Sequence, residues 1–294
     1  MRFSPAAGLG KLLQRFMGQG KKYGMEWWVM IIGATIVLAI VIMAFCAPYI
    51  APFSPYDQNT GPQLSPPNNI HIMGTDNLQR DVWSRVVFGS QTILRVAVLA
   101  AVLSSVVGIT FGLISGFAGG NLDRIFSLIM DSVYSFPGLI LAIAFAAMLG
   151  PGVVNITLAV AVIYIPTYFR LVRGQTLAIK EELYVEAAKA IGATNRVILW
   201  KYIFPNVIAT TVVVFSMNVA DAIMIEAALT YLGLGLPPSV VDWGMDLAMG
   251  KKYLPSGQWW LITFPGAMIS LLALGFTMLG EGLSEILNPR LLER

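Results

Sequence analysis

The sequence is short of the residues from which most enzymes build a reactive centre. Among 294 residues there is one cysteine, Cys46, and one histidine, His71. A single cysteine excludes an internal disulfide framework and a cysteine-based metal site, and a single histidine excludes the H-E-x-x-H pattern of zinc proteases. The phosphate-binding pattern G-x-x-x-x-G-K is also absent, so nucleotide hydrolysis is not expected on this chain. We therefore predict no catalytic residues, no metal and no cofactor.

Charged residues are scarce as well. They make up 12% of the chain, against 56% hydrophobic residues, and the mean hydropathy is +0.72. These values lie far from those of soluble domains and predict an all-α protein of the membrane, because backbone groups in lipid must find their partners within each helix. A crossing takes about 20 apolar residues. Six stretches qualify as transmembrane helices: 27–50, 92–117, 124–149, 153–172, 207–231 and 260–280.

The basic residues predict the orientation of these spans. Five of the nineteen precede the first span, one opens the third, six lie at 170–201 between the fourth and fifth, and two follow the sixth, which places fourteen on one side. Lysine and arginine collect in cytoplasmic segments, so both termini are expected in the cytoplasm. The net charge is only +3, and the basic residues flank spans rather than cluster with aromatic ones, which argues against nucleic acid as a partner.

The spans divide the chain into five predicted parts. Residues 1–26 form a basic cytoplasmic segment, 27–50 the first transmembrane helix, and 51–91 an external loop. Residues 92–280 form a five-helix core that includes a cytoplasmic loop at 173–206, and 281–294 form a cytoplasmic tail.

The second half of the external loop has a helical pattern. Thr75 or Asp76 is suited to cap a helix, and Asp81 and Arg85 are spaced to pair at i, i+4. An apolar stripe of Val82, Trp83, Val86 and Val87 accompanies them. We predict an amphipathic helix on the outer membrane surface, which either seals the bundle or contacts a partner.

The second span carries glycines at every fourth position, namely Gly108, Gly112 and Gly116, continued by Gly120. This spacing places them on one helix face, where small residues let two backbones approach closely. Packing inside the chain is favoured over a subunit interface, and no ligand is expected there.

The charged segment from 184 to 206, YVEAAKAIGATNRVILWKYIFPN, interrupts the apolar runs. Its first half is predicted to be a short helix with Tyr184, Ala187, Ala188 and Ile191 on one face. Gly192 follows where a helix would end in a left-handed residue. Thr194 or Asn195 is suited to cap a second short helix over 196–202, and Pro205 to mark the start of the fifth span.

This segment resembles the EAA loop of ABC importer permeases, which docks on a cytoplasmic ATPase. The match consists of Glu186, Ala187, Ala188, Gly192 and Pro205. Three further runs resemble the dipeptide, oligopeptide and nickel branch of that family: HIMGTDNLQRDVWSRVVFGS at 71–90, ALTYLGLGLPPSVVDWG at 228–244 and GEGLSEILNPR at 280–290. The chain is similar to the second permease subunit of these importers over nearly its whole length.

The resemblance implies the type I importer architecture, placed in the inner or plasma membrane. It implies a second homologous permease, two cytoplasmic ATPases and an external substrate-binding protein as partners, besides membrane lipid. The transported substrate would be a peptide, with nickel or oligosaccharides as alternatives. An ion channel or a non-catalytic membrane scaffold could share the spans but would not need the EAA-like loop.

The fifth span holds the candidates for contact with the solute. Met217, Asp221 and Met224 share one face of a helix, and a carboxylate inside a membrane by default faces a cavity or a partner. We expect Glu226 to form a salt bridge with Arg95. Asp131, early in the third span, is expected to pair inside the bundle or to satisfy backbone groups freed by Pro137.

Overall fold

The computed structural model describes residues 24–286, and every regular element in this range is helical. The predicted all-α class is therefore confirmed. The first 23 residues and residues 287–294 lie outside the described range, so the predicted basic N-terminal segment and most of the C-terminal tail are not described. The elements are α2 (Met25–Phe45), α3 (Ala47–Ile50), α4 (Val82–Ala118), α5 (Gly120–Tyr134), α6 (Gly138–Leu149), α7 (Val153–Ile179), α8 (Leu183–Ala190), α9 (Asn195–Val197), a π-helical turn (Ile198–Ile203), α10 (Phe204–Tyr231), α11 (Trp243–Gly250), a 3₁₀ turn (Lys251–Ser256) and α12 (Trp260–Ile286).

The membrane-crossing helices agree in number with the six predicted spans. Five helical runs are long and apolar enough to cross a membrane, and α5 with α6 makes a sixth if the bent pair is counted as one span. The two helices of that pair meet at 90°. The bend falls at Pro137, whose ring fixes φ and removes a backbone donor, so an unbroken helix is disfavoured there.

The predicted boundary between the external loop and the second span is wrong. The amphipathic segment and the second span form one helix, α4, of 37 residues. At 1.5 Å per residue it is about 55 Å long, well beyond a hydrocarbon core of about 30 Å. In its first turns Val82, Val86 and Val87 are buried in the protein, so the predicted apolar stripe packs against the bundle.

The N-terminus of α4 is capped by a residue other than the two predicted. Asp81, and neither Thr75 nor Asp76, accepts the Ser84 N–H at 2.8 Å. The predicted Asp81–Arg85 pair is also absent from the ion pairs of the described residues, because each side chain has another partner. Capping by aspartate typically stabilises a helix by about 1 kcal/mol.

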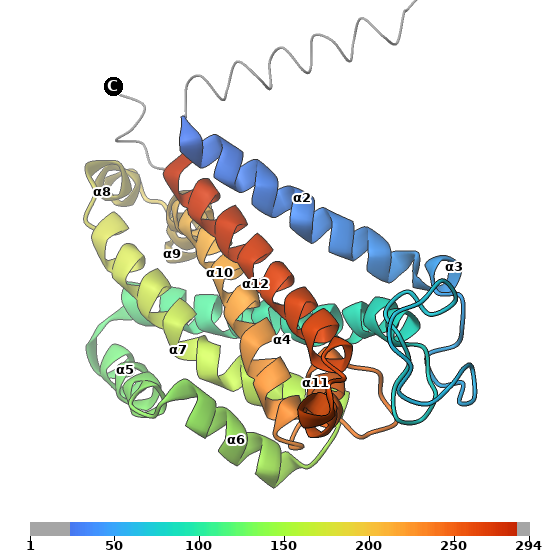
Figure 1. Ribbon diagram of the computed structural model, residues 1–294. Helices are drawn as coiled ribbons and strands as arrows, with labels where there is room; N and C mark the ends of the chain where they lie inside the picture. The colour runs from blue at the N-terminus through green and yellow to red at the C-terminus, as the bar shows by residue number, and fades with distance from the viewer. Residues whose placement is uncertain (1–23, 287–294) are drawn as a thin grey trace, which may run out of the picture.

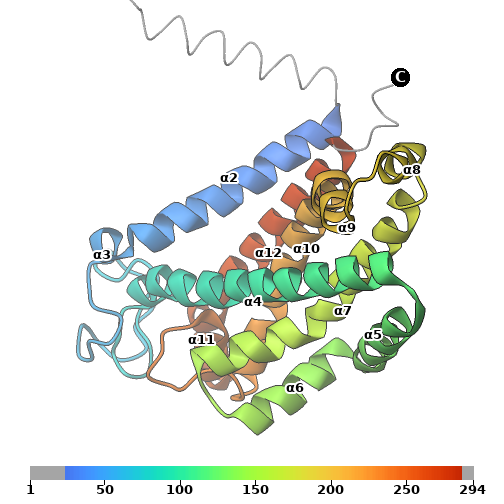
Figure 2. The same cartoon turned by 180° about the vertical axis from the view of Figure 1, so that it is seen from behind.

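The glycine face of α4 lies against α7. A Cβ added at Gly108 would lie 2.5 Å from the Tyr168 Cβ, and one at Gly112 would lie 2.9 Å from the Phe169 carbonyl oxygen. At Gly116 it would lie 2.8 Å from the Thr176 Cβ. The two helices run beside each other in Figure 2, and their close approach depends on the missing side chains. Gly120 belongs to α5 and has no such neighbour.

The two ends of the bundle have different elements. Figure 1 shows α8, the start of α2 and the end of α12 at one end, and α3, α11 and the loop after α3 at the other. The main apolar core lies between them and receives buried side chains from α2, α4, α6, α7, α10, α11 and α12.

Candidate coupling surface and transport cavities

The segment that resembles the EAA loop projects at the α8 end of the bundle (Figure 1). In α8 the buried positions are Val185 and Ala188, which are 0% and 3% exposed. Val185 packs in a small apolar cluster with Ile198 and Ile203. The predicted face was only partly correct, because Tyr184 and Ala187 are exposed and Ile191 is 84% exposed. The helix is rotated so that Val185 is buried, while Tyr184 lies at the edge of the contact and its hydroxyl accepts from Asn206 Nδ2 at 3.4 Å.

The turn after α8 is a Schellman motif centred on Gly192. This residue has a φ of +87°, the left-handed region in which glycine is favoured. The Ala193 N–H donates to the Ala188 carbonyl and the Gly192 N–H to the Lys189 carbonyl, both at 3.0 Å. The glycine is exposed, and an added Cβ would meet no atom within 4 Å. Its backbone conformation, rather than tight packing, therefore explains the glycine.

The second half of the segment continues into the fifth span without a break. Residues 195–231 form a single helical run whose π-helical turn precedes Pro205. In this turn the Phe204 N–H donates to the Leu199 carbonyl, five residues back. A proline lacks an N–H and crowds the carbonyl four residues before it, and the wider π turn accommodates both effects.

Exposed apolar side chains surround this turn. Leu183 is 80% exposed, Ile191 84% and Trp200 55%, while Glu186 beside them is also exposed. Together we name Leu183, Glu186, Ile191, Gly192 and Trp200 the coupling surface. Apolar side chains displayed on a polar protruding segment are typical of a protein–protein contact.

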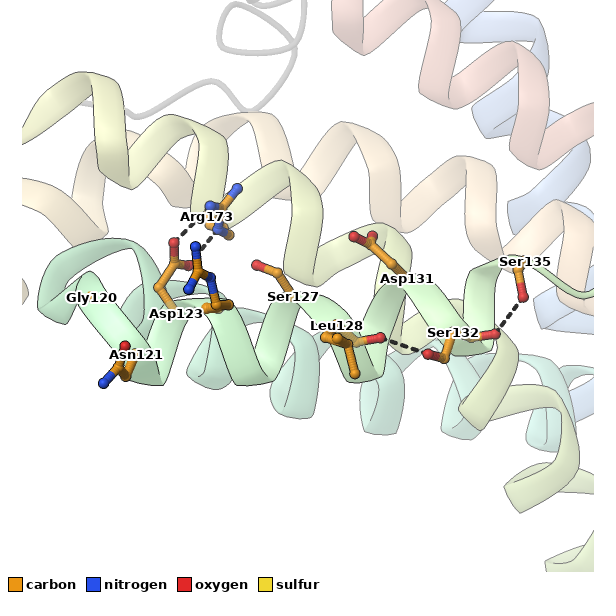
Figure 3. Close-up of a pocket in the computed structure, with 10 residues that line it drawn as sticks. Gly120, Asn121, Asp123, Ser127, Leu128, Asp131, Ser132, Ser135 and Arg173 are labelled. Carbon is orange, nitrogen blue, oxygen red and sulfur yellow. Dashed lines mark hydrogen bonds and ion pairs between the residues drawn. The ribbon is translucent and has the colours of Figure 1, made fainter.

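A polar cavity of about 920 Å³ lies along α5 (Figure 3). Arg173 of α7 donates to Asp123 of α5 at 2.7 Å, and Figure 3 shows these two side chains facing each other at one end of the cavity. Asp131 pairs with Arg170 at 2.8 Å, which agrees with the expectation of an internal partner. None of the residues of α5 is buried. The cavity is therefore an open polar surface fixed by two ion pairs between α5 and α7.

A second cavity, of about 380 Å³, is lined by Asp221 of α10. Tyr134, Tyr164, Thr167 and Asn218 are among the other residues lining it. Asp221 is in none of the ion pairs formed among residues 24–286. A carboxylate at a cavity lined by both polar and apolar side chains is suited to bind a cationic group.

The other two predicted solute-facing residues have different surroundings. Met217 lies against α12, where a Cβ added at Gly280 would be 2.9 Å from the Met217 Cγ, and it lines a separate cavity with Glu26 and Glu281. Met224 is 53% exposed. Neither methionine is among the residues that line the Asp221 cavity.

The expected Glu226–Arg95 salt bridge is wrong. Glu226 is fully buried, whereas Arg95 is exposed and lines an apolar groove between α2 and α4. The partners of Glu226 are Thr230 and Asp242. Asp242 is the N-cap of α11. It was not identified from the sequence, because it lies beyond the end of the span and carries the same charge as Glu226.

The opposite end of the bundle holds a cluster of buried ion pairs. His71 Nδ1 lies 2.9 Å from Asp81 Oδ1, and Arg80 donates to Asp76 at 2.6 Å. Arg85 Nε donates to Asp246 Oδ1 of α11 at 2.9 Å. The Arg85 side chain is 3% exposed and that of Asp246 is 14% exposed. These pairs join the loop after α3, the start of α4 and α11 into one cluster, which we name the external cluster after the predicted external loop at 51–91.

Two tryptophans fasten this cluster to the bundle. Trp243 Nε1 donates to the Val86 carbonyl at 2.8 Å, and Trp260 Nε1 donates to the Thr75 carbonyl at 3.2 Å. Trp243 is fully buried, and its ring packs against Gly89. A Cβ added at Gly89 would lie only 2.6 Å from the Trp243 ring. Within residues 24–286 no group of three or more His, Cys, Asp or Glu side chains is arranged to hold a metal ion.

These features define a class of protein. Apolar helices that cross a membrane, a protruding polar segment with apolar side chains at one end, and open polar cavities along the helices are typical of a subunit of a membrane transporter.

The chain belongs to the family of binding-protein-dependent transport system inner membrane components, whose family model matches residues 108–293. A second model, the N-terminal transmembrane domain of oligopeptide transport permease C, matches residues 28–67. The chain is therefore an integral membrane permease of this family.

Curated relatives extend over most of the chain. The probable D,D-dipeptide transport system permease protein DdpC of Escherichia coli (strain K12) is 37% identical over 87% of this chain and 86% of its own length. The dipeptide transport system permease protein DppC of Alkalihalophilus pseudofirmus is 36% identical over 89% of this chain and 86% of its own length. The glutathione transport system permease protein GsiD of Pectobacterium atrosepticum is 36% identical over 87% and 85%, respectively.

Proposed function

We propose that this chain is one permease subunit of an ATP-driven importer that carries peptides across the membrane. The observation that carries this proposal is the similarity to permeases of dipeptide and glutathione systems over at least 87% of the chain. The chain supplies half of the translocation path, and a second homologous permease supplies the other half.

The coupling surface is the contact with the ATPase subunits. Two cytoplasmic ATPases bind and hydrolyse ATP, and one of them holds α8 and the turn at Gly192. Their closure on ATP moves Glu186, Ala187, Ala188 and the helix that continues through Pro205 into α10, and so tilts the bundle. The coupling needs a partner with different affinities for two conformations of the permease. The unbroken helical run from 195 to 231 supports this role, because it links the surface mechanically to the span that bears Asp221.

The solute passes along the side of the bundle where α5, α6 and α10 are open. Asp221 contributes the charged group of this path, and the predicted neighbours Met217 and Met224 are left out of it because neither lines the Asp221 cavity. Both the cavity along α5 and the Asp221 cavity are open on the surface of this chain, which suits a path completed by a second subunit.

The orientation follows from the same assignment. Both termini and the coupling surface lie in the cytoplasm, and an external binding protein delivers the solute to the end that holds the external cluster. The common location of α8 with the start of α2 and the end of α12 supports this arrangement (Figure 1).

The substrate is tested by reconstituting the complete complex with its binding protein in liposomes and measuring ATP hydrolysis and uptake. Dipeptides and tripeptides are expected to stimulate both activities. Stimulation only by nickel chelates or only by oligosaccharides would replace peptide with that substrate. Passive ion conduction by this chain alone, without ATPase subunits, would contradict the whole assignment and favour a channel.

The coupling surface is tested with Ile191→Glu. This side chain is 84% exposed, so the substitution has little effect on folding of the permease, but a buried charge at a contact costs several kcal/mol. We expect the purified variant to lose most of its ATPase subunits. The matched control is Ile70→Glu, an isoleucine 69% exposed in the external loop, which should retain them. Retention by both variants would place the ATPase contact elsewhere.

A further inference from the structure

Two acidic side chains meet in the interior at the outer end of α10. Glu226 lies near the end of α10, and Asp242 is the N-cap of α11. Both are 0% exposed. A Cβ added at Gly244 would lie 2.5 Å from the Ala227 carbonyl oxygen and 3.1 Å from Asp242 Oδ2, so Asp242 lies beside the turn of α10 that carries Glu226. Carboxyl groups are rarely buried unless they are paired.

The hydrogen bonds of the four carboxyl oxygens leave one oxygen on each group without a donor. Glu226 Oε1 accepts from the Thr230 hydroxyl at 3.3 Å, and Asp242 Oδ2 accepts from the Met245 N–H at 3.1 Å. Glu226 Oε2 and Asp242 Oδ1 are buried and have no donor among the described residues. Two carboxylate oxygens cannot bond to each other, because an ionised carboxylate is only an acceptor.

Among the ion pairs and hydrogen bonds of residues 24–286, none joins a cation to this pair. Arg85 of α4 binds Asp246 and the Pro55 carbonyl, Arg80 binds Asp76, and Arg95 of α4 is exposed at the groove beside α2. Lys251, which follows α11, lies 4.4 Å from the centre of the Tyr231 ring. Asp246, the other acid of α11, adds a further negative charge near Asp242. Two ionised carboxylates in contact inside such a site would repel strongly.

We propose that Glu226 and Asp242 hold one proton between them, and that this proton fastens α11 to α10. The proton turns one of the two orphaned oxygens into a donor for the other, which satisfies both and removes one of the two charges. The bond joins the segment 232–250 to the span that carries Asp221. The proposal does not depend on which solute is carried.

The environment of Asp242 sets the direction of the pH dependence. The pKa of Asp242 is raised to about 6, and the largest cause of this shift is burial of the carboxyl group. A carboxyl group whose pKa is raised on folding keeps a proton that the unfolded chain releases at about pH 4. The contribution of the pair to stability is therefore fully present in acid, decreases as the pH rises from about 4 through about 6, and decreases further when the shared proton leaves.

The test compares two purified complexes, the wild type and the Glu226→Gln variant. The glutamine amide N–H₂ donates to Asp242 but carries no titratable proton. Infrared spectra at neutral pH should show the C=O stretch of a protonated carboxyl in the wild type and lose it in E226Q. The apparent Tm of the wild type should fall between about pH 5 and about pH 9, the range above the ordinary carboxyl pKa. That of E226Q should fall less.

Two results would overturn the proposal: a carboxylic acid band that persists unchanged in E226Q, or the same pH profile for the wild type and E226Q. If E226Q does not assemble, Asp242→Asn serves for the same two measurements, because asparagine retains the acceptor that caps α11. The matched control is Glu281→Gln on α12, an exposed acid at the other end of the bundle, which should leave both readouts at wild-type values.

Discussion

Replacing Gly108 with alanine should force α4 and α7 apart. The new Cβ would lie 2.5 Å from the Tyr168 Cβ and 2.8 Å from the Ile165 carbonyl oxygen. Ordinary contacts between such atoms are 3.4–4 Å long. The Ile165 carbonyl belongs to the α7 backbone, and the Tyr168 Cβ is bonded directly to the backbone Cα of Tyr168. Rotating a side chain cannot relieve either overlap, so one helix has to move by about 0.5–1 Å, an estimate from these contact limits.

Two opposing terms set the size of the effect. Alanine favours a helix over glycine by about 1 kcal/mol in water, and by less in a membrane, where the helix persists when packing is lost. Overpacking of a tight contact costs about 1–3 kcal/mol, and a rigid neighbour places Gly108→Ala near the upper end of that range. The net loss should be about 2 kcal/mol, which corresponds to a fall in apparent Tm of about 4–8 °C for a chain of this size.

The measurement is the thermal loss of the monodisperse peak in size-exclusion chromatography of the detergent-solubilised protein. The control is Gly174→Ala on α7, because a Cβ there meets no atom within 4 Å and the site is exposed. That variant should match the wild type or be slightly more stable. Equal thermal stability of G108A and G174A would refute the reasoning, because the two sites differ chiefly in the contact with the other helix.

Two further predictions concern the external cluster. Asp246→Asn should lower the free energy of unfolding by about 3–5 kcal/mol, because the buried Arg85 guanidinium loses the carboxylate that compensates its burial; thermal denaturation checks this, and a loss under 1 kcal/mol would mean that water reaches the arginine. Trp243→Phe keeps most of the ring packing but loses the bond to the Val86 carbonyl, so it should cost about 1 kcal/mol. A much larger loss of thermal stability in that variant would show that the indole packing, rather than the hydrogen bond, holds α11 in place.

The number and approximate positions of the spans could be predicted from hydropathy, because long apolar runs have few other uses. The continuity of α4 could not. Its first turns carry Ser84, Arg85 and Ser90, which are polar and therefore typical of a surface helix, yet all three are buried. Arg85 is buried because Asp246, 161 residues away in the chain, lies opposite it. The pattern of apolar and polar residues near Arg85 cannot predict a partner so far away in the chain.

The segment at 184–206 was predictable where its chemistry is local. The end of α8 follows from the left-handed residue at Gly192. A helix also starts after Thr194, as predicted, but the Thr194 side chain forms no capping hydrogen bond. The face that α8 turns inward was not predictable in the same way. Val185 is buried and Ile191 exposed, although both are β-branched and apolar, because the rotation of a two-turn helix is decided by the surface on which it packs.

The same reasoning applies to the face of α10. Met217, Asp221 and Met224 share a face on an isolated helix, but α10 packs against α12, α4, α7 and α11, so successive turns meet different neighbours. Met217 meets α12 at Gly280, whereas Asp221, one turn later, lines a cavity beside Tyr164. No cation pairs with Asp221 among the ion pairs of residues 24–286, while Asp123 and Asp131 on α5 each have an arginine of α7. A carboxylate inside a membrane needs a counter-charge. Asp221 is exposed on the surface of this chain, and in the proposed importer we expect the amino group of a passing peptide to pair with it.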